Sequence, residues 1–333
     1  MTIWLAVIAG TVLGYVLASG DFCFHSTWRR LVSEPIDPSP ARAYVVFLIV
    51  ATPLVQLLDR TGVIDPYVPP FTPAAAIVGG LIFGGGMVVA QTCVSGMVYK
   101  LGTGMVGMVV AIAGWAVGDI ITWQGPLQGL RSSLTENVIS TTGDDGSSEA
   151  ATVVSSLGFI GVVVLVALGA GAGWWIHRRP PTTVRPGGVI VNNRWALGAA
   201  TAAAVVLGWL LVAWHGGDYS FGTSGVPNQI YNAVTGDEGG SMWIPLSLVS
   251  LVPGAVVAAA TRQKWWLRGE SGARYAQLGV GGMIMGVGAA IAGGCNLGHS
   301  MVGVPLLSVG SIVTTVAIIA GVFAAARAAD RLG

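Results

Sequence analysis

The chain has 333 residues, of which 53% are hydrophobic and only 9% are charged. Soluble globular domains carry about 25% charged residues, so this composition excludes an ordinary soluble enzyme and favours a membrane protein. The formal net charge of +1 says little about partners. We expect the lipid bilayer to surround the chain, and we expect no nucleic-acid partner.

Long apolar runs follow one another along the chain, separated by short polar breaks, as is typical of transmembrane helices. The predicted spans are nine: 2–19, 43–58, 74–90, 104–123, 156–176, 195–214, 242–260, 276–292 and 305–326. No basic segment precedes the first run, so we interpret it as a retained span and not as a signal peptide. The sequence therefore predicts an all-α polytopic membrane protein.

The basic residues divide unequally between the two sides that nine spans create. With the N-terminus on the first side, that side carries two of the 16 Lys and Arg residues, Arg60 and Arg131, and the opposite side carries the other fourteen. Because cytoplasmic loops are enriched in Lys and Arg, we expect a multi-pass protein of the bacterial inner membrane, with the N-terminus outside and the C-terminus cytoplasmic. The polar outer loop 124–155 is expected to be mobile.

Two pairs of segments indicate an internal repeat. VGGLIFGGGMVVAQTC (78–93) and VGGMIMGVGAAIAGGC (280–295) are identical at eight of sixteen positions, including the final cysteine. GDFCFHS (20–26) and GDYSFGT (217–223) align Cys23 with Ser220. The predicted units are repeat one (1–130, spans 1–4), a linker (131–194) with the outer loop, span 5 and a basic cytoplasmic loop, and repeat two (195–333, spans 6–9). A linker with one span gives the repeats opposite orientations in the membrane.

Inverted repeats usually place a transport path at their interface, lined by discontinuous helices. Four glycine-rich or polar breaks follow full spans, at 20–30, 91–103, 217–235 and 293–304, and each is a candidate re-entrant half-helix. A single membrane cysteine is most often a packing residue, but Cys23, Cys93 and Cys295 all fall in these breaks, which favours a substrate pathway. The backbone and polar residues expected to support it are Gly96, Gly293, Gly294, Asn296, Gly298 and His299.

A thiol is a weak hydrogen-bond donor and its sulfur a weak acceptor, so thiols suit a polarizable sulfur atom better than a hard oxygen. An anion in such a path would be held by backbone N–H groups at half-helix N-termini. His25 and His299 are near cysteines in the sequence, but the spacing matches no strong metal motif, and we expect no metal and no structural disulfide. A membrane sulfurtransferase that carries a persulfide remains an alternative, although the absence of a CxxC motif favours transport.

The motifs GDFCFHS, QTCVSG and GGCNLGHS resemble the three cysteine motifs of the YeeE/YedE family of bacterial membrane proteins, and the likeness covers nearly the whole chain. The resemblance implies an hourglass fold in which thiosulfate passes along the cysteines by S–H···S hydrogen bonds. It implies that Cys295 serves the outer side, Cys93 the inner side, and that Cys23 lies nearest the cytoplasm. It further implies a small TusA-like sulfur-carrier protein as a partner, no cofactor and no enzymatic activity, and it leaves another sulfur or selenium compound open as the substrate.

Overall fold

The computed structural model describes residues 3–142, 148–155, 193–223, 225–236, 241–262 and 265–332, with a few scattered positions between 160 and 178. This part of the chain is helical apart from one short hairpin, β1 (Ser140–Thr142) and β2 (Ser148–Ala150). Among the described residues, seven helices are long and apolar enough to cross a membrane, or eight if the bent pair α6–α7 is one span. The predicted all-α polytopic membrane protein is confirmed.

The long helices coincide with eight of the predicted spans. They are α1 (Ile3–Gly20), α3 (Ser39–Arg60), α4 (Pro73–Ala90), α6 (Gly107–Trp123), α10 (Arg194–His215), α12 (Trp243–Val249) followed by α13 (Leu251–Thr261), α14 (Gly272–Ala292) and α15 (Val309–Leu332). The predicted fifth span, 156–176, lies largely outside the described residues, so the expected total of nine spans is not tested.

Each of the four predicted breaks contains a short helix. These helices are α2 (Phe24–Arg29), α5 (Val94–Gly102), α11 (Val226–Thr235) and the π-helix η1 (Leu297–Gly303). The stretches Ile3–Arg29 and Pro73–Gly102 each have the length and composition of one interrupted span. A fifth short helix, α7 (Gln128–Thr135), follows α6 at an angle of 68°, so the first part of the outer loop, which we expected to be mobile, is helical.

The breaks after α4 and α14 have the same local cause. Each helix ends at a residue in the left-handed conformation, Gln91 with φ 54° and Gly293 with φ 77°. These residues are equivalent in the two aligned segments of the sequence. A left-handed residue ends the helical hydrogen-bond ladder, and glycine adopts this conformation without a steric penalty. After Gln91 the chain continues in an extended conformation to Cys93, which precedes α5.

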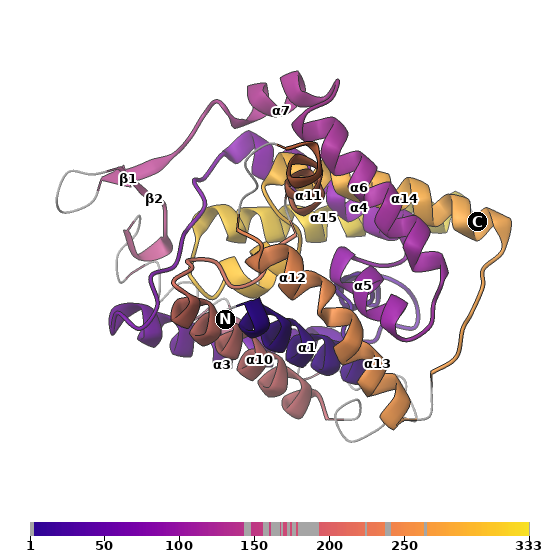
Figure 1. Ribbon diagram of the computed structural model, residues 1–333, viewed down its shortest axis with the longest axis horizontal. Helices are drawn as coiled ribbons and strands as arrows, with labels where there is room; N and C mark the ends of the chain where they lie inside the picture. Colours follow the sequence, from indigo (N-terminus) through magenta and orange to yellow (C-terminus); the bar gives the residue numbers. More distant parts are fainter. Residues whose placement is uncertain are drawn as a thin grey trace.

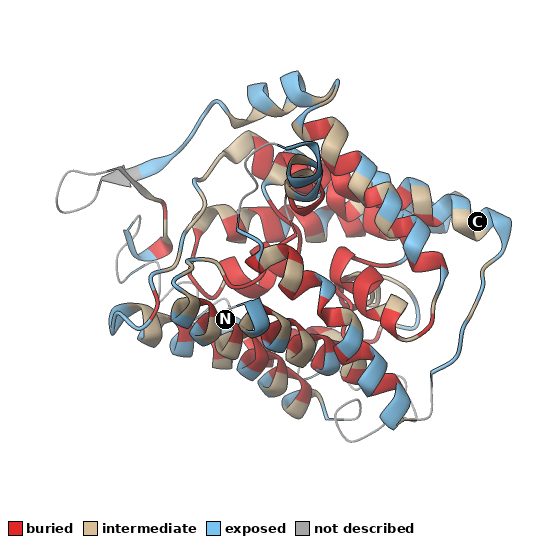
Figure 2. Ribbon diagram, viewed as in Figure 1, coloured by how far each residue is buried: buried red, intermediate tan, exposed pale blue. Residues whose placement is uncertain are grey.

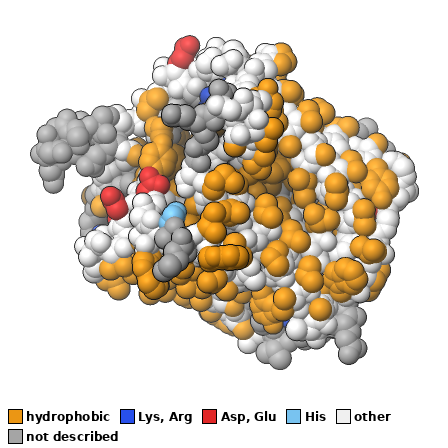
Figure 3. Space-filling model, viewed as in Figure 1, with side chains coloured by type: hydrophobic (Ala, Val, Ile, Leu, Met, Phe, Trp, Pro, Cys, Tyr) orange, Lys and Arg blue, Asp and Glu red, His pale blue; other side chains and the backbone are white. Residues whose placement is uncertain are grey.

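The long helices form two groups with the short helix α5 between them (Figure 1). One group consists of α4, α6, α14 and α15, and the other of α1, α3, α10 and α12–α13. Buried residues line the faces that the helices turn toward one another, and exposed residues lie at the periphery (Figure 2). Hydrophobic side chains cover much of the outer surface in the same view (Figure 3), as expected of helices that face lipid.

The packing of the helices is the same when the two halves are exchanged. In the centre, α4 and α14 run antiparallel, since Gly79 packs against Ala292 and Gly281 packs against Ala90. These two contacts interchange when the aligned segments are swapped. In the same way α15 packs against α4 while α6 packs against α14, and α13 packs against α1 while α3 packs against α10. An inverted internal repeat produces this pattern.

Glycines allow the central helices to approach closely. A β-carbon at Gly84 would collide with the carbonyl oxygen of Ile318, and one at the equivalent Gly286 would collide with that of Trp115. Contacts of small residues at this spacing bring helix backbones together in membranes, where packing and not hydrophobic burial drives association. The glycine-rich runs therefore fix the core of the group, and the breaks that carry Cys93 and Cys295 extend from its ends.

Candidate functional site

Two of the three cysteines are in direct contact. Cys23 precedes α2 and Cys93 precedes α5, each with an extended backbone. Their Sγ atoms lie 3.6 Å apart, and each residue is 1% exposed. This separation is much longer than a disulfide bond of about 2.05 Å, and both thiols are free. We call Cys23 and Cys93 the thiol pair.

Cys93 is oriented by the first turn of α5. Its sulfur accepts a hydrogen bond from the backbone N–H of Gly96 at 3.4 Å, in the role that Ser, Thr or Asp usually has at a helix N-terminus. The hydroxyl of Ser95 lies 3.4 Å from the same sulfur. Because the backbone amide occupies one acceptor direction of the sulfur, the S–H bond of Cys93 can point toward the sulfur of Cys23 or toward the hydroxyl of Ser95. The positive end of α5 also faces the sulfur.

Lys100 carries a positive charge close to the thiol pair. Thr92 Oγ1 lies 4.0 Å from Cys23 Sγ, and Lys100 donates from Nζ to that hydroxyl at 3.4 Å. Lys100 also acts electrostatically on Cys23. An anion that reached the thiol pair would therefore encounter one fixed cation through a single intervening hydroxyl.

Gly96 is required by the geometry of the thiol pair. A β-carbon at this position would lie 2.6 Å from Thr92 Oγ1, 2.9 Å from Cys23 Sγ and 3.3 Å from Cys93 Sγ. Real β-carbons essentially never approach other atoms within 3.0 Å. A residue with a β-carbon would displace the thiols, so this contact requires glycine.

Cys295 lies in the corresponding break after α14. It is 1% exposed, and its sulfur accepts a hydrogen bond from the backbone N–H of Leu297 at 3.2 Å. The sulfur is thus held by a backbone amide, as that of Cys93 is. Its neighbour Asn296 donates from Nδ2 to Met87 Sδ at 3.1 Å, which ties the break to α4.

His299 has a structural role within this break. Its Nε2 lies 3.2 Å from the carbonyl oxygen of Ala292, and its Nδ1 lies 3.1 Å from the hydroxyl of Ser311. A carbonyl only accepts, so Nε2 carries a proton and donates to Ala292, and in the neutral ring Nδ1 accepts from the hydroxyl of Ser311. A β-carbon at Gly294 would lie 2.7 Å from His299 Nε2. Gly294 therefore leaves room for the histidine that links α14 to α15.

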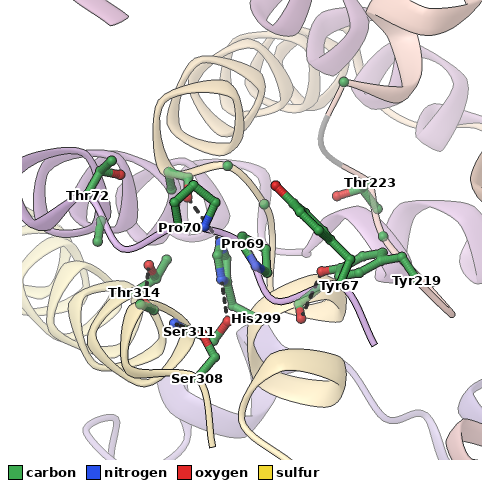
Figure 4. Close-up of a pocket in the computed structure, with 18 of the residues that line it drawn as sticks. Tyr67, Pro69, Pro70, Thr72, Tyr219, Thr223, His299, Ser308, Ser311 and Thr314 are labelled. Carbon is green, nitrogen blue, oxygen red and sulfur yellow. Dashed lines mark hydrogen bonds between the residues drawn. The ribbon is translucent and has the colours of Figure 1, made fainter. Parts of the chain in front are cut away.

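A cavity of about 670 Å³ opens beside Gly293 and Gly294, the two residues that precede Cys295, and we call it the vestibule. The chain leading into α4, residues of 218–223 and 225–229, the end of α14, η1 and the start of α15 contribute to its wall, together with residues of α6 and α7. Gly293, Gly294, Gly298 and His299 line it. In Figure 4 His299 lies between Pro70 and Ser311, and Tyr219 and Thr223 lie across from it. The Tyr219 hydroxyl donates to the carbonyl oxygen of Gly298 at 3.5 Å.

The segment 217–223 is the repeat counterpart of the segment that carries Cys23. Ser220 stands where repeat one has Cys23, and both Ser220 and Thr223 are completely buried. Neither hydroxyl has a hydrogen-bond partner among the described residues. The Thr223 hydroxyl lies beside the Cys295 thiol without reaching the geometry of a hydrogen bond to it.

The predicted site residues thus form two groups. Cys23, Cys93 and Gly96 meet at the thiol pair, while Gly293, Gly294, Asn296, Gly298 and His299 surround Cys295. The described residues contain no cluster of three or more His, Cys, Asp or Glu that could hold a metal ion.

Several polar residues of the site were not predicted from the sequence. Thr92 and Ser95 lie near Cys93 within the motif QTCVSG, and Thr223 ends the aligned segment of repeat two. Their positions in those motifs were the available signal. Arg131 had no such signal, because it lies outside the repeats.

A family model described as "Sulphur transport" matches residues 19–324. The chain is also similar to two curated thiosulfate transporters named TsuA. The protein from Spirochaeta thermophila is 28% identical over 326 residues, which cover 96% of each chain. The protein from Escherichia coli is 24% identical over 337 residues, which cover 96% of this chain and 92% of the relative.

Proposed function

The chain belongs to the sulphur transport (YeeE/YedE) family, and from this we propose that it takes up thiosulfate across the bacterial cytoplasmic membrane through a cysteine-lined constriction. The observation that carries the proposal is the thiol pair, two buried and reduced thiols 3.6 Å apart where α1 and α4 are interrupted. Two relatives that carry the name thiosulfate transporter support the choice of substrate.

In the proposed path the anion enters the vestibule, passes Cys295 and then passes the thiol pair. At each step a neutral thiol donates its S–H to the terminal sulfur of thiosulfate. A hydrogen bond to a charged acceptor is roughly twice as strong as a neutral one, so the anion can replace the S–H···S contact between Cys23 and Cys93. The backbone amides of Leu297 and Gly96 hold the sulfurs of Cys295 and Cys93 in place during passage.

The proposed orientation places the N-terminus and the vestibule outside and the C-terminus in the cytoplasm. It rests on the excess of Lys and Arg on one side of the predicted spans. The thiol pair then lies on the cytoplasmic side of Cys295, with Lys100 and His25 near Cys23. A small TusA-like sulfur-carrier protein is the proposed acceptor there. The inverted repeat, with boundaries at 130 and 195, is part of the proposal, and the exchangeable packing of α4 and α14 supports it.

The contact between Cys23 and Cys93 also supports a second candidate, a membrane sulfurtransferase. In that reaction a cysteine thiolate attacks the outer sulfur of thiosulfate, a persulfide S–S bond forms, and the sulfur–sulfur bond of thiosulfate breaks to release sulfite. The second thiol of the pair would then attack the inner sulfur of the persulfide, form a disulfide between Cys23 and Cys93, and release the outer sulfur as hydrosulfide. Transport of another sulfur or selenium compound is the remaining alternative.

Growth complementation tests the proposed function. A bacterium that lacks thiosulfate uptake, given this protein, should grow with thiosulfate as its sole sulfur source, and the Cys93→Ala variant should not restore growth. Growth on sulfate or cysteine should be equal with and without the protein. Mass spectrometry of the purified protein after exposure to thiosulfate separates the two mechanisms, because a persulfide on Cys23 or Cys93, or a disulfide between them, would support the sulfurtransferase.

A further inference from the structure

The vestibule is lined by polar groups that the protein itself leaves without partners. The indole Nε1–H of Trp123, the hydroxyl of Thr223 and the amide oxygen of Gln229 are buried atoms with no hydrogen-bond partner among the described residues. Most buried polar groups in proteins are paired, because leaving one unpaired is destabilising. Three such atoms belong to residues that line one cavity, so a polar ligand bound there could pair with them.

A cation stands among these groups. Arg131 lies with its guanidinium carbon 3.5 Å from the centre of the Trp123 ring, and its Nε donates to the carbonyl oxygen of Ala290 at 3.0 Å. The stacking and this hydrogen bond fix the plane of the guanidinium and leave N–H groups of a five-donor side chain for a ligand. Of the described residues that line the vestibule, Arg131 is the only Lys or Arg.

Two carboxylates lie near this charge, and Asp119 acts electrostatically on Arg131. Asp119 is fully buried, and its two oxygens accept hydrogen bonds from the backbone N–H groups of Gly225 and Asn228, at 3.4 Å each. It therefore compensates the positive end of α11. Asp218 also lines the vestibule, but it is exposed, so solvent and salt screen its charge.

The Trp123 and Thr223 donors lie along the same segment of the wall. A β-carbon at Gly225 would lie 4.0 Å from Trp123 Nε1, so the indole N–H stands beside the segment that carries Thr223. Thr223 in turn lies beside the Cys295 thiol. The guanidinium of Arg131 and the indole N–H of Trp123 therefore lie at one end of this group of side chains. The hydroxyl of Thr223 follows, and the thiol of Cys295 lies at the other end.

We propose that Arg131, Trp123 and Thr223 form a subsite for the oxygen-bearing end of a tetrahedral sulfur oxyanion, and that this subsite turns the terminal sulfur of thiosulfate toward Cys295. The inference rests on the proposed function and deepens it. A guanidinium fork, an indole N–H and a hydroxyl donate to oxygen atoms. The thiol suits the polarizable sulfur. Sulfate would satisfy the first part of the site and not the second, so the subsite captures oxyanions and Cys295 discriminates among them.

Uptake of radiolabelled thiosulfate by proteoliposomes tests the subsite. Trp123→Phe keeps the ring and removes the N–H, Thr223→Val keeps the shape and removes the hydroxyl, and Arg131→Gln removes the charge. We expect the thiosulfate KM to rise several-fold for the two neutral substitutions and about tenfold or more for Arg131→Gln, with the maximal rate within about twofold of wild type. Raising the ionic strength should raise the KM of the wild-type protein and change that of Arg131→Gln much less.

Matched substitutions outside the vestibule provide the controls. Trp115→Phe removes another unpartnered indole N–H of α6, Thr122→Val removes a hydroxyl that already has a partner, and Arg60→Gln removes the other basic residue predicted on this side. All three should keep the wild-type KM. Unchanged KM values in all three vestibule variants, or equal changes in the controls, would overturn the subsite while leaving thiosulfate transport intact.

A second measurement does not depend on transport. Thiosulfate should raise the melting temperature of the wild-type protein in detergent, since a ligand stabilises the state that binds it. The shift should be much smaller for Arg131→Gln and unchanged for Arg60→Gln. Equal shifts for Arg131→Gln and wild type would overturn the subsite, whereas no uptake by the wild-type protein in liposomes would overturn the proposed function itself.

Discussion

The three cysteines differ in what their thiols face. Cys93 and Cys23 face each other, so in the absence of an anion each can satisfy the other with an S–H···S contact. Cys295 has no second thiol among its hydrogen-bond partners in the described structure, and its sulfur is held by the amide of Leu297. In the proposed path the thiol pair is therefore a closed contact that an anion must open, while Cys295 has no such thiol contact to be broken.

This difference leads to a prediction about combined cysteine substitutions. Cys93→Ala and Cys295→Ala should each lose nearly all thiosulfate-dependent growth, and Cys23→Ala should lose less, because repeat two has Ser220 in place of Cys23. The Cys23→Ala, Cys93→Ala double variant should be no worse than Cys93→Ala alone, because the first substitution already removes the contact between the thiols. Initial uptake rates measure all four variants.

The control for this prediction is a pair of thiols that do not touch. The effects of Cys23→Ala and Cys295→Ala on the uptake rate should multiply, since independent sites contribute additive free energies. One S–H···S contact contributes about 1 kcal/mol by analogy with other hydrogen bonds, which alone is several-fold in rate, so a nearly complete loss would imply an added barrier at a narrow constriction. Multiplying effects for Cys23 and Cys93 as well would show that the two thiols act separately.

Gly96 gives a second prediction at the same scale. Gly96→Ala adds a β-carbon 2.9 Å from Cys23 Sγ and 2.6 Å from Thr92 Oγ1, so it should separate the thiol pair and reduce uptake at least tenfold. Gly85→Ala is the matched control, because a β-carbon at Gly85 meets no atom within 4 Å. Normal uptake by a correctly inserted Gly96→Ala protein would mean that the thiol pair lies off the path.

Among the helices, α4 and α14 form the centre of the structure. Gly84 and Gly286 occupy equivalent positions, and a β-carbon at either would strike a carbonyl oxygen of the neighbouring helix, in α15 and α6 respectively. We predict that Gly84→Ala and Gly286→Ala each lower the free energy of unfolding by about 1–3 kcal/mol through overpacking. Melting temperatures in detergent measure the effect.

Gly85→Ala is again the comparison, and here its expected effect has the opposite sign. Alanine favours the helical conformation over glycine by about 1 kcal/mol, and the position has open space around it. A melting temperature that falls equally for Gly84→Ala and Gly85→Ala would show that the glycines serve flexibility rather than close packing.

The positions of the helices and of their breaks were predictable from the sequence. An apolar run near the length of a bilayer crossing, followed by glycine and polar residues, is a local signal, and the breaks at 91–103 and 293–304 carry it. The contact between Cys23 and Cys93 was not predictable, because it joins two breaks 70 residues apart. Helix packing brings those breaks together, and no local pattern encodes the distance.

Arg131 was missed for a related reason. Its surroundings in the sequence are polar, which favours a mobile loop, and the partners that order it are distant in the chain. The stacking on Trp123 and the hydrogen bond to the carbonyl oxygen of Ala290 exist only after α6, α7 and α14 have packed. A tertiary contact of this kind outweighs the local composition.

Across the whole molecule, arginines bond to helix C-termini at both ends of the bundle. Arg262 donates to the carbonyl oxygen of Ser19 at the end of α1, and Arg274 donates to that of Ala90 at the end of α4, the latter at 2.7 Å. Cations complement the negative ends of helices. Both arginines belong to the side that the charge distribution predicts to be cytoplasmic, whereas Arg131 does the same for α14 on the predicted outer side.

The orientation of the protein follows from this distribution and is the last prediction. Gly129 in α7 and Gly272 at the start of α14 are exposed positions with no atom near a new β-carbon, so a cysteine at either should fold normally. In a background without the three native cysteines, a membrane-impermeant thiol reagent should label Gly129→Cys in intact cells. Gly272→Cys should be labelled only after the membrane is opened.

Gly129 and Gly272 distinguish the two possible orientations because both are exposed and we expect them on opposite sides of the membrane. Both should react completely in detergent, which controls for burial. If Gly272→Cys were labelled from outside and Gly129→Cys protected, the protein would have its C-terminus outside, against the excess of Lys and Arg. The vestibule with Arg131 would then open to the cytoplasm, and the order of cysteines met by an incoming anion would be reversed, from the thiol pair to Cys295.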